Sequence, residues 1–294
     1  VKKIIIFSRD ELKQFEMAQT INTSTHKGIR YFLGDIRDAA RLNRALEGVD
    51  YVIHAAALKQ VPAAEYNPFE FIKTNIQGTE NVIQAAVENN VKKVIALSTD
   101  KAVSPINLYG ATKLCADKII IAANNIFGNK KISFSLVRYG NVMSSRGSVI
   151  PEFKKQLNSG KKFKLTDPNM TRFNLTLEEC IDTVMWSLKH TLGGEIVIKK
   201  SPSYRLIDLA KSISTKNSID VIGLRPGEKM HEELISNSNN YLIFEKNNFY
   251  ILIDKVLNER INKIRKKLKL KKDLKPFSYN SKENKNFLNV NNLK

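Results

Sequence analysis

Residue types that could carry acid–base chemistry gather between positions 98 and 113. A run of Ser, Thr, Asp and Lys at 98–101 follows the apolar segment 94–97, which is short and continuous and so typical of a buried parallel strand. Tyr109 and Lys113 come next, and their spacing places both on one face of a helix, one turn apart. An ammonium beside a phenol lowers the phenol pKa, so this pair is suited to proton transfer.

The polar run is more informative than the Tyr–Lys spacing, which occurs by chance on many helices. Open α/β sheets bind ligands at the carboxyl ends of their strands, and this run lies at such an end. We therefore expect a site centred on four consecutive residues, Ser98, Thr99, Asp100 and Lys101. The alternative for Lys101 is an ordinary lysine of a surface loop.

The segment 3–7 predicts another strand, and Ser8, Arg9 and Lys13 follow its end. The adenosine ribose of a dinucleotide usually lies at the end of the second strand of such a fold. An acidic residue alone at that place favours NAD, whereas an arginine can hold the 2′-phosphate of NADP. Arg9 therefore indicates NADP, with a surface arginine at a helix start as the alternative.

Two further predicted strands, 29–33 and 51–54, end in polar or small residues. Asp35 is placed to accept a hydrogen bond from an adenine amino group, with Ile36 against the ring, although capping a helix is nearly as ordinary a role. The second strand leads into three residues that let a ligand approach the backbone, followed by a lysine at the same sheet edge: Ala55, Ala56, Ala57 and Lys59.

Strands alternate with helices from residue 3 to residue 137, which predicts an α/β fold with a Rossmann-like, doubly wound parallel sheet. The last strand is expected at 195–198. The expected parts are an NADP-binding domain (1–143 plus about 173–198), a smaller C-terminal substrate-binding domain (144–172 plus 199–275) and a poorly ordered tail (276–294).

Other polar residues fit structural roles. His54 lies in an apolar strand and is expected in the core, and Asn75, inside a helix predicted over 71–89, is expected to bridge backbone groups. Cys115 and Cys180 suggest no disulfide framework and fit a reducing compartment.

The composition predicts a globular protein: 294 residues, 42% of them hydrophobic, with a formal net charge of +19. No run of about 18 apolar residues exists, and the N-terminus lacks a signal-peptide pattern, so we expect no membrane span and a cytoplasmic location. The basic residues of 258–275 predict a solvated face rather than a nucleic-acid site, because no arginine-rich recognition helix or zinc-ligand spacing accompanies them. No metal site is expected.

Taken together, the motifs resemble the extended short-chain dehydrogenase/reductase family, and within it the soluble inverting UDP-N-acetylglucosamine 4,6-dehydratases of pseudaminic acid synthesis. Lys101 after Thr-Asp separates this group from relatives with Asp-Glu there, and Tyr109 separates it from membrane-anchored and capsule enzymes that carry methionine. The resemblance covers nearly the whole chain and rests on the segments 8–13, 55–59, 64–68, 98–113, 138–142, 145–149, 170–173 and 225–229.

The resemblance implies a dehydration with bound NADP. Tyr109, its pKa lowered by Lys113 and the nicotinamide charge, takes the proton of the sugar 4-hydroxyl while hydride leaves carbon 4. Lys101, if desolvated enough to be neutral, removes the proton from carbon 5. Asp100 helps water leave from carbon 6, and Thr99 bonds to the 4-oxygen. Ser98, Lys113 and Tyr139 are also assigned to the cofactor.

The resemblance also assigns residues to the UDP-sugar substrate, UDP-N-acetylglucosamine, and implies a homo-oligomer, either a hexamer or a dimer. Two alternatives share part of this evidence: a UDP-sugar 4-epimerase or dehydratase/5-epimerase of capsule synthesis, and a catalytically dead assembly or binding protein. The assigned substrate residues are Asn141, Thr166, Arg225 and Glu228, with Arg172 as a weaker candidate for the diphosphate and Lys59 at either ligand.

The chain departs from the family pattern at its start. The family begins with a strand and a Gly-x-x-Gly-x-x-Gly turn that receives the dinucleotide pyrophosphate, and this sequence contains no such turn. The resemblance places Val1 at the second strand of the family, so we expect a truncated sequence whose sheet lacks its central first strand. Two strand edges are then expected to lie unpaired. Without that turn, the chain is expected to bind NADP poorly.

Overall fold

The computed structural model describes residues 1–145 and 147–294. Arg146, which belongs to one of the segments that carry the family resemblance, lies outside the described residues. Among the residues described, no helix is both long enough and apolar enough to cross a membrane.

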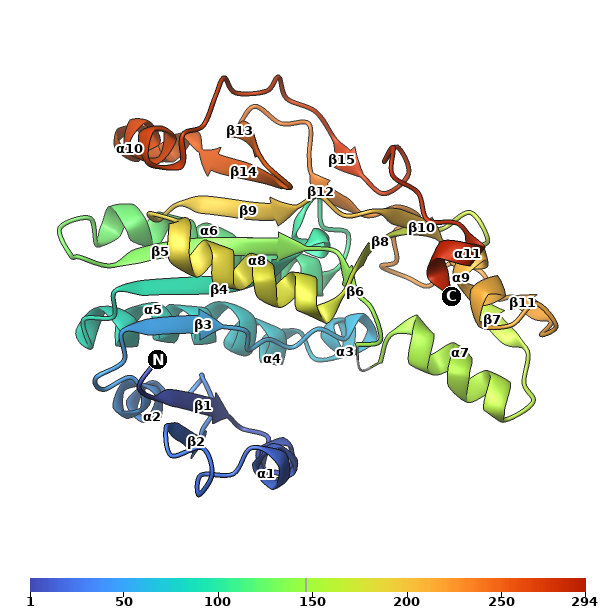
Figure 1. The fold of residues 1–294 in the computed structure, drawn as a ribbon, viewed down its shortest axis with the longest axis horizontal. Coiled ribbons are helices and arrows are strands. Elements are labelled where there is room, and N and C mark those ends of the chain that lie inside the picture. Colours follow the sequence, from blue (N-terminus) through green and yellow to red (C-terminus); the bar gives the residue numbers. More distant parts are fainter. Residues whose placement is uncertain (146) are drawn as a thin grey trace.

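A six-stranded sheet forms the centre of the molecule (Figure 1). Four strands run parallel, and an antiparallel hairpin extends one edge. In spatial order the strands are β13 (Tyr241–Lys246), β14 (Phe249–Asp254), β9 (Glu195–Lys199), β5 (Ser133–Tyr139), β4 (Lys93–Thr99) and β3 (Tyr51–His54). The predicted doubly wound α/β class is confirmed, as is the strand that precedes the polar run.

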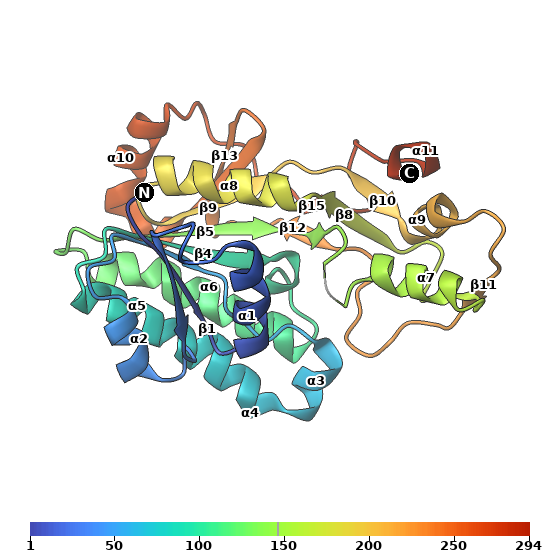
Figure 2. The ribbon, with the colours of Figure 1, turned by 60° about the horizontal axis from the view of Figure 1, so that its bottom comes forward.

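Helices cover both faces of this sheet (Figures 1 and 2). One face packs on α2 (Ala39–Ala45), α5 (Gly78–Glu88) and α6 (Leu108–Ile126), and the other packs on α8 (Leu177–His190) and α10 (Asn258–Leu268). Along β4, Val94 and Ala96 point into the first core, whereas Ile95 points into the second. Successive side chains of a strand alternate between faces, so an apolar run is what a strand buried on both sides requires.

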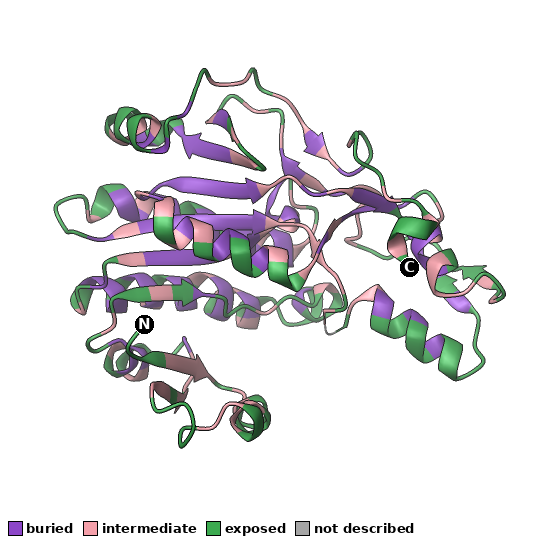
Figure 3. Cartoon of the chain, viewed as in Figure 1, coloured by how far each residue is buried: buried purple, intermediate pink, exposed green. Residues whose placement is uncertain are grey.

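Two strands stand apart from the main sheet. β1 (Ile4–Ser8) and β2 (Ile29–Leu33) form a separate parallel pair, with α1 (Glu11–Thr20) between them in the chain. Within the described residues, β1 pairs with β2 alone and β3 pairs with β4 alone. Neither β1 nor β2 contains a buried residue, in contrast to the main sheet (Figure 3). One edge of β1 and one edge of β3 are therefore unpaired among the described residues, which is the expected number of unpaired edges.

The connections between β3 and β5 lie close to the ligand edge of the sheet. They comprise α3 (Val61–Tyr66), α4 (Pro68–Phe71), a π-helical segment (Ile72–Gln77) that leads into α5, and a short 3-10 helix (Asp100–Ala102) after β4. The single helix predicted over 71–89 is therefore divided into segments of different winding.

A smaller lobe lies beyond the carboxyl ends of β4 and β5 (Figure 1). It has its own apolar core around Phe153, Phe163 and Leu209. Its elements are β6 (Asn141–Val142), α7 (Val149–Asn158), β7 (Phe163–Leu165), β8 (Thr171–Leu175), β10 (Ser203–Arg205), α9 (Leu206–Ile213), β11 (Ile219–Val221), β12 (Glu233–Ile235), β15 (Tyr279–Asn280) and α11 (Val290–Leu293). A further 3-10 turn, Lys255–Leu257, precedes α10.

Two expectations differ from this fold. The strand at 195–198 is not the last of the sheet, because β14 pairs antiparallel with β9 and β13 pairs with β14, although the sequence predicted both segments to lie in the substrate-binding part. The tail at 276–294 is not poorly ordered. The Tyr279 hydroxyl donates to the Ser201 carbonyl oxygen at 2.9 Å, and its ring lies 4.9 Å from that of Phe173. An aromatic anchor thus holds an otherwise polar segment.

Candidate active site

The polar run after β4 is held in place by its own backbone and by α6. The Thr99 hydroxyl donates to Asp100 Oδ1 at 2.9 Å and accepts from the Lys101 amide at 3.4 Å. Asn107 caps α6, its Oδ1 accepting from the Gly110 amide at 2.7 Å. A methyl group on Gly110 would collide with the Lys101 carbonyl oxygen. Glycine at this position therefore lets the helix start approach the run closely.

Asp100 and Lys101 form a largely buried ion pair that a second carboxylate, that of Glu232, joins. Lys101 Nζ lies 3.0 Å from Asp100 Oδ1 and 3.2 Å from Glu232 Oε1. Arg172 Nε lies 3.7 Å from the same Glu232 oxygen. Asp100 is fully buried, and Glu232 is 2% exposed. The sequence analysis missed Glu232, which no local pattern marks.

The charges of this cluster set its protonation. Burial lowers the pKa of Lys101, but the carboxylates of Asp100 and Glu232 together outweigh burial and hold it above the usual lysine range. Burial raises the pKa of Asp100, and Glu232 adds to the rise against the opposing effect of Lys101. Burial also acts to raise the pKa of Glu232, but Lys101 and Arg172 pull it below its usual value. The raised pKa favours the ammonium form of Lys101, so burial alone does not meet the stated condition for a neutral amine.

Tyr109 lies on α6, its side chain buried, and its pKa is raised rather than lowered. Burial is the main cause, and the nearby Lys101 charge opposes it. Lys113 does not act as the expected partner, because its Nζ donates to the Leu97 carbonyl oxygen at 2.9 Å. Burial lowers the pKa of Lys113, with Asp117 opposing. The i,i+4 spacing put both residues on one face but did not fix where the amine points.

The residues around this cluster form a buried polar network. The Ser98 hydroxyl donates to Asp117 Oδ2 at 2.6 Å, and Arg138 Nη2 lies 3.1 Å from the same oxygen. Asn75 bonds the amide and the carbonyl oxygen of Leu58 at 2.8 and 3.0 Å, so it bridges backbone groups as expected. His54 is buried, as expected, and bonds to the Thr79 hydroxyl; burial lowers its pKa to about 3.

The residues predicted for the adenosine end of a cofactor lie at the ends of β1 and β2. Arg9 Nη1 is 3.2 Å from Asp35 Oδ2, and Arg37 Nη2 is 2.8 Å from the same oxygen. Although burial acts to raise it, the pKa of Asp35 falls to about 2, because Arg37 and Arg9 donate to the carboxylate. The Ser8 hydroxyl accepts from the Asp10 amide.

The other residues predicted to bind the cofactor differ in how far they are buried. Ile36 is buried against Gly78 in the core beneath α5, so its side chain does not face solvent. Tyr139 is half-buried at the end of β5, and burial raises its pKa. The positions exposed at the end of β3 and in the following loop are Ala55, Ala56, Ala57 and Lys59, and Lys13 is an exposed residue of α1 that pairs with Asp10.

The predicted substrate residues come from the smaller lobe. Asn141 Oδ1 is buried with no hydrogen-bond partner among the described residues. Arg172 is already engaged, since Nη1 donates to the carbonyl oxygens of Thr171 and Met230 at 2.7 and 3.2 Å. Thr166 directly follows β7, and its side chain is buried.

Arg225, which is exposed, and Glu228, which is half-buried, share a turn that lies beside the start of α6. The Glu228 amide donates to the Arg225 carbonyl oxygen at 3.1 Å. Asn107 Nδ2 donates to the Gly227 carbonyl oxygen at 2.7 Å, and Lys229 Nζ donates to the Val103 carbonyl oxygen at 2.6 Å. These two bonds fix the turn beside the start of α6.

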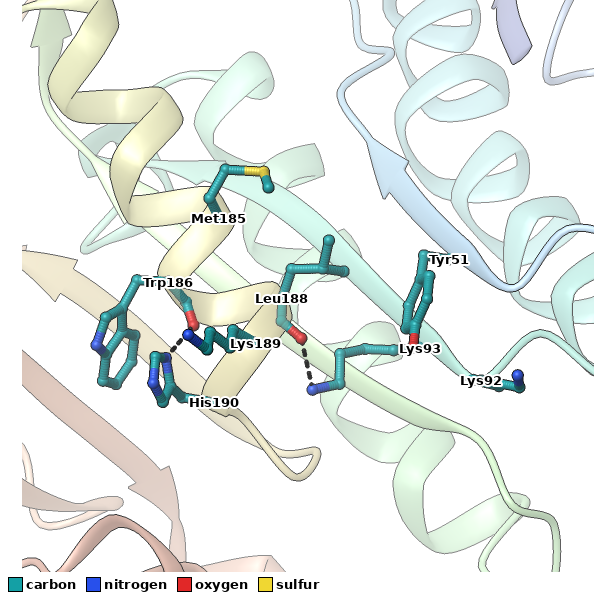
Figure 4. A pocket seen from close by; sticks show the side chains of 8 residues that line it. All are labelled: Tyr51, Lys92, Lys93, Met185, Trp186, Leu188, Lys189 and His190. Atoms are coloured by element: carbon teal, nitrogen blue, oxygen red, sulfur yellow. Dashed lines mark hydrogen bonds between the residues drawn. The ribbon is translucent and has the colours of Figure 1, made fainter. Parts of the chain in front are cut away.

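A hollow of about 740 Å³ lies at the opposite end of the sheet from this cluster (Figure 4). Lys93 Nζ donates there to the carbonyl oxygens of Leu188 and Thr191 at 2.8 and 2.6 Å, so its amine caps the end of α8. The amine of Lys93 therefore has a structural role at this helix end and is not placed to act as an acid or a base in the hollow. Its walls are Tyr51, Lys92, Lys93, Met185, Trp186, Leu188, Lys189 and His190. No group of His, Cys, Asp and Glu in the described part of the chain is arranged to hold a metal ion.

Comparison with known proteins finds relatives that match most of the chain. Residues 1–254 match the family described as polysaccharide biosynthesis protein. A UDP-N-acetylglucosamine 4,6-dehydratase (inverting) from Campylobacter jejuni is 52% identical over 289 residues, 96% of this chain and 85% of the relative. A UDP-glucose 4-epimerase from Rickettsia typhi is 45% identical, over 81% of this chain and 70% of the relative. The X-ray structure of Pen from Bacillus thuringiensis superposes with a TM-score of 0.89 at 38% identity, covering 99% of this chain and 88% of Pen. The resemblance stated from the sequence is confirmed.

Proposed function

Because the chain belongs to the family described as polysaccharide biosynthesis protein, we propose that it is a UDP-N-acetylglucosamine 4,6-dehydratase that inverts carbon 5. The observation that carries the proposal is the buried Asp100–Lys101 pair beside Tyr109. A plain oxidation needs one proton acceptor for a hydroxyl, whereas an elimination also needs an acid for the leaving water and a base for the adjacent carbon. The cluster offers all three groups at one strand end.

The proposed cofactor is NADP. Arg9, with Ser8 and Lys13, supports the 2′-phosphate, since an arginine at this strand end can pair with it in place of Asp35. Lys113, next to the strand end at Leu97, supports the nicotinamide end. The described residues contain no Gly-x-x-Gly-x-x-Gly turn for the pyrophosphate, so the fit is good only at the two ends of the dinucleotide. A dinucleotide held there would supply the hydride chemistry of the reaction, the oxidation of carbon 4 and the later reduction of carbon 6.

The Lys101 ammonium must lose a proton before it can act as a base. Asp100 Oδ1, 3.0 Å away, is a proton acceptor within reach, and its raised pKa makes the carboxylate a stronger base. One transfer from Lys101 to Asp100 therefore produces both the amine that takes the carbon 5 proton and the acid that protonates the leaving 6-hydroxyl. Tyr109 takes the proton of the 4-hydroxyl as a phenolate, the form that the nearby Lys101 charge favours against burial, and the Thr99 hydroxyl bonds to the 4-oxygen.

The proposed substrate contacts follow from the smaller lobe. The side-chain oxygen of Asn141, which has no hydrogen-bond partner among the described residues, suits a sugar hydroxyl or amide. It lies near the cluster, because a methyl group on the preceding residue, Gly140, would lie 3.3 Å from Asp100 Oδ2. Arg225, which is exposed, suits the diphosphate, with Glu228 and Thr166 beside the nucleotide. Arg172 is a weaker candidate, because its guanidinium is already bonded, and Lys59 is proposed at either ligand. A cytoplasmic homo-oligomer, hexamer or dimer, completes the proposal.

The test is mass spectrometry of the product formed from UDP-N-acetylglucosamine with NADP. We expect a product that has lost one water, and Lys101→Ala should abolish it without changing cofactor binding. A Lys101→Ala variant with wild-type turnover would contradict the assignment. Tyr109→Phe should prevent both product and transient NADPH formation.

A 4-epimerase is the second candidate, favoured by the 45% identity to the Rickettsia protein. Epimerisation loses no water, so a product of unchanged mass decides for it. The alternative of a catalytically dead binding protein predicts neither product. Titration of NADP into the protein of residues 1–294 is expected to show weak binding. Micromolar affinity would mean that tight binding does not require a glycine-rich turn.

A further inference from the structure

Glu232 is a buried carboxylate of the smaller lobe that reaches the catalytic run from a different part of the chain. It directly precedes β12, and Ser281 next to β15 holds its backbone: the Glu232 amide donates to Ser281 Oγ at 2.9 Å, and the Ser281 amide donates to the Glu232 carbonyl oxygen at 2.8 Å. Both residues are at most 2% exposed. The backbone that carries Glu232 is therefore well fixed.

The side chain of Glu232 is aimed at Lys101. One carboxylate oxygen lies 3.2 Å from Lys101 Nζ, and the other is buried with no hydrogen-bond partner among the described residues. Asp100 Oδ2 is also buried without such a partner. An ionised carboxylate with an unsatisfied buried oxygen destabilises a fold, so its retention beside a reactive lysine favours a role in the site.

We propose that Glu232 is a positioning residue, whose carboxylate holds the Lys101 ammonium beside Asp100 and keeps one proton shared between Lys101 and Asp100. The inference rests on the proposed dehydration, in which that shared proton must move. Arg172, 3.7 Å from Glu232, balances its charge, so the four groups together are neutral with Lys101 and Arg172 charged and both carboxyls ionised. The charged and titratable groups facing the cluster are Asp100, Lys101, Tyr109, Arg172, Tyr204 and Lys229.

The sign of the effect follows from Coulomb's law. A negative charge beside the pair favours proton binding at both of its members, so it raises the two apparent pKa values of the pair together. Removing that charge in Glu232→Gln should lower both values, while the amide keeps the shape of the side chain. The pH range in which the pair has its active protonation state then moves to lower pH.

The first measurement needs no turnover. Trace acetic anhydride acylates only the neutral amine, and mass spectrometry of the Lys101 peptide reports the rate. A fall of one pKa unit makes the reaction about tenfold faster at any pH below the pKa. We expect at least this increase in Glu232→Gln and an increase of less than about threefold in the charge-conserving Glu232→Asp. Glu233→Gln is the matched control, because its carboxylate bonds Ser104 and Ser278 instead, and it should leave the rate unchanged.

Arg172→Met provides an independent variant of opposite sign. It removes a positive charge that lowers the Lys101 pKa, so acylation of Lys101 should become slower. If Glu232→Gln does not fold, the rates of Lys101 acylation in Glu232→Asp and Arg172→Met test the proposal instead. Unchanged acylation of Lys101 in a folded Glu232→Gln protein, or the same increase in Glu233→Gln, would overturn the proposal.

Activity gives the second readout. Both limbs of the kcat–pH profile should move to lower pH in Glu232→Gln, whereas a merely structural role would reduce kcat and leave the limbs in place. If the wild-type chain forms no dehydrated product, the proposed function fails. The acylation rates still test the effect of Glu232 on Lys101, because they do not depend on turnover. The two failures are therefore distinguishable.

Discussion

Replacing Lys101 by methionine should destabilise the protein far more than replacing a lysine of an exposed ion pair. Methionine has an unbranched chain of similar length, so the change removes the charge and little volume. Asp100 and Glu232 then remain buried beside each other without the ammonium that lies 3.0 and 3.2 Å from them. Removing one partner of a buried pair costs about 3–5 kcal/mol, because the remaining charge keeps its desolvation penalty.

Lys92→Met is the matched control. Lys92 Nζ lies 2.7 Å from Asp50 Oδ1, a shorter distance than in the buried pair, but the two side chains are 65% and 58% exposed. Exposed pairs contribute about 0–1 kcal/mol. An entropy of unfolding of roughly 2.1 cal/mol/K per residue gives about 0.6 kcal/mol/K for a chain of this length. The melting temperature at pH 8 should therefore fall by about 5–8 °C in Lys101→Met and by less than about 2 °C in the control.

The pH dependence gives a second criterion. Burial and the neighbouring carboxylate raise the pKa of Asp100 even with Lys101 present, and the loss of the ammonium raises it further. A carboxyl whose folded-state pKa exceeds its unfolded value stabilises the fold at low pH, and this stability is lost as the pH rises. The penalty of Lys101→Met should thus shrink between pH 8 and pH 5. Equal penalties for the two lysine variants at pH 8, with no pH trend, would refute the reasoning.

Three further predictions concern single sites. Gly110→Ala should lower the melting temperature and turnover together, because the added methyl meets the Lys101 carbonyl oxygen and displaces the catalytic run; a fully active, equally stable variant would contradict this. A thiol reagent at pH 8 should label exposed Cys115 within minutes and leave Cys180 unlabelled, since burial raises the Cys180 pKa to about 12; mass spectrometry counts the labels. His54 should stay neutral, with imidazole NMR shifts that do not titrate between pH 5 and pH 8, since burial depresses its pKa to about 3.

The parts of the site that sequence alone predicted are those set by local rules. An apolar run buried on both faces identifies β4, and the polar residues that follow it must lie at the ligand edge. The spacing of Tyr109 and Lys113 indicates one face of a helix, and both residues lie on α6. These features need only neighbouring residues, so Asp100, Lys101 and Tyr109 were found at one place.

The features that were missed depend on contacts between distant segments. Glu232 meets Lys101 across 131 positions, and neither spacing nor composition around Glu232 signals the contact. The direction of the Tyr109 pKa shift depends on burial and on a lysine amine that points to Leu97 instead of to the phenol. The hairpin of β13 and β14 did leave a signal, because two apolar runs, 241–244 and 249–253, flank a polar segment that ends in two asparagines, and Asn247 adopts a positive φ of 53° there.

Because β1 and β2 pair apart from the main sheet, we expect this part of the molecule to open independently of the rest. The pair is tied to the body through side chains, with Ile36 against Gly78 and Arg37 within 2.7 Å of Glu70, rather than through the backbone ladder of the main sheet. Its amides should therefore exchange with solvent faster than those of β4 and β5. Arg9 lies at the end of β1, so a dinucleotide that uses Arg9 binds only the closed fraction. The apparent dissociation constant of the dinucleotide is the intrinsic constant divided by the closed fraction. Once the open form predominates, each further 1.4 kcal/mol that favours opening weakens binding about tenfold.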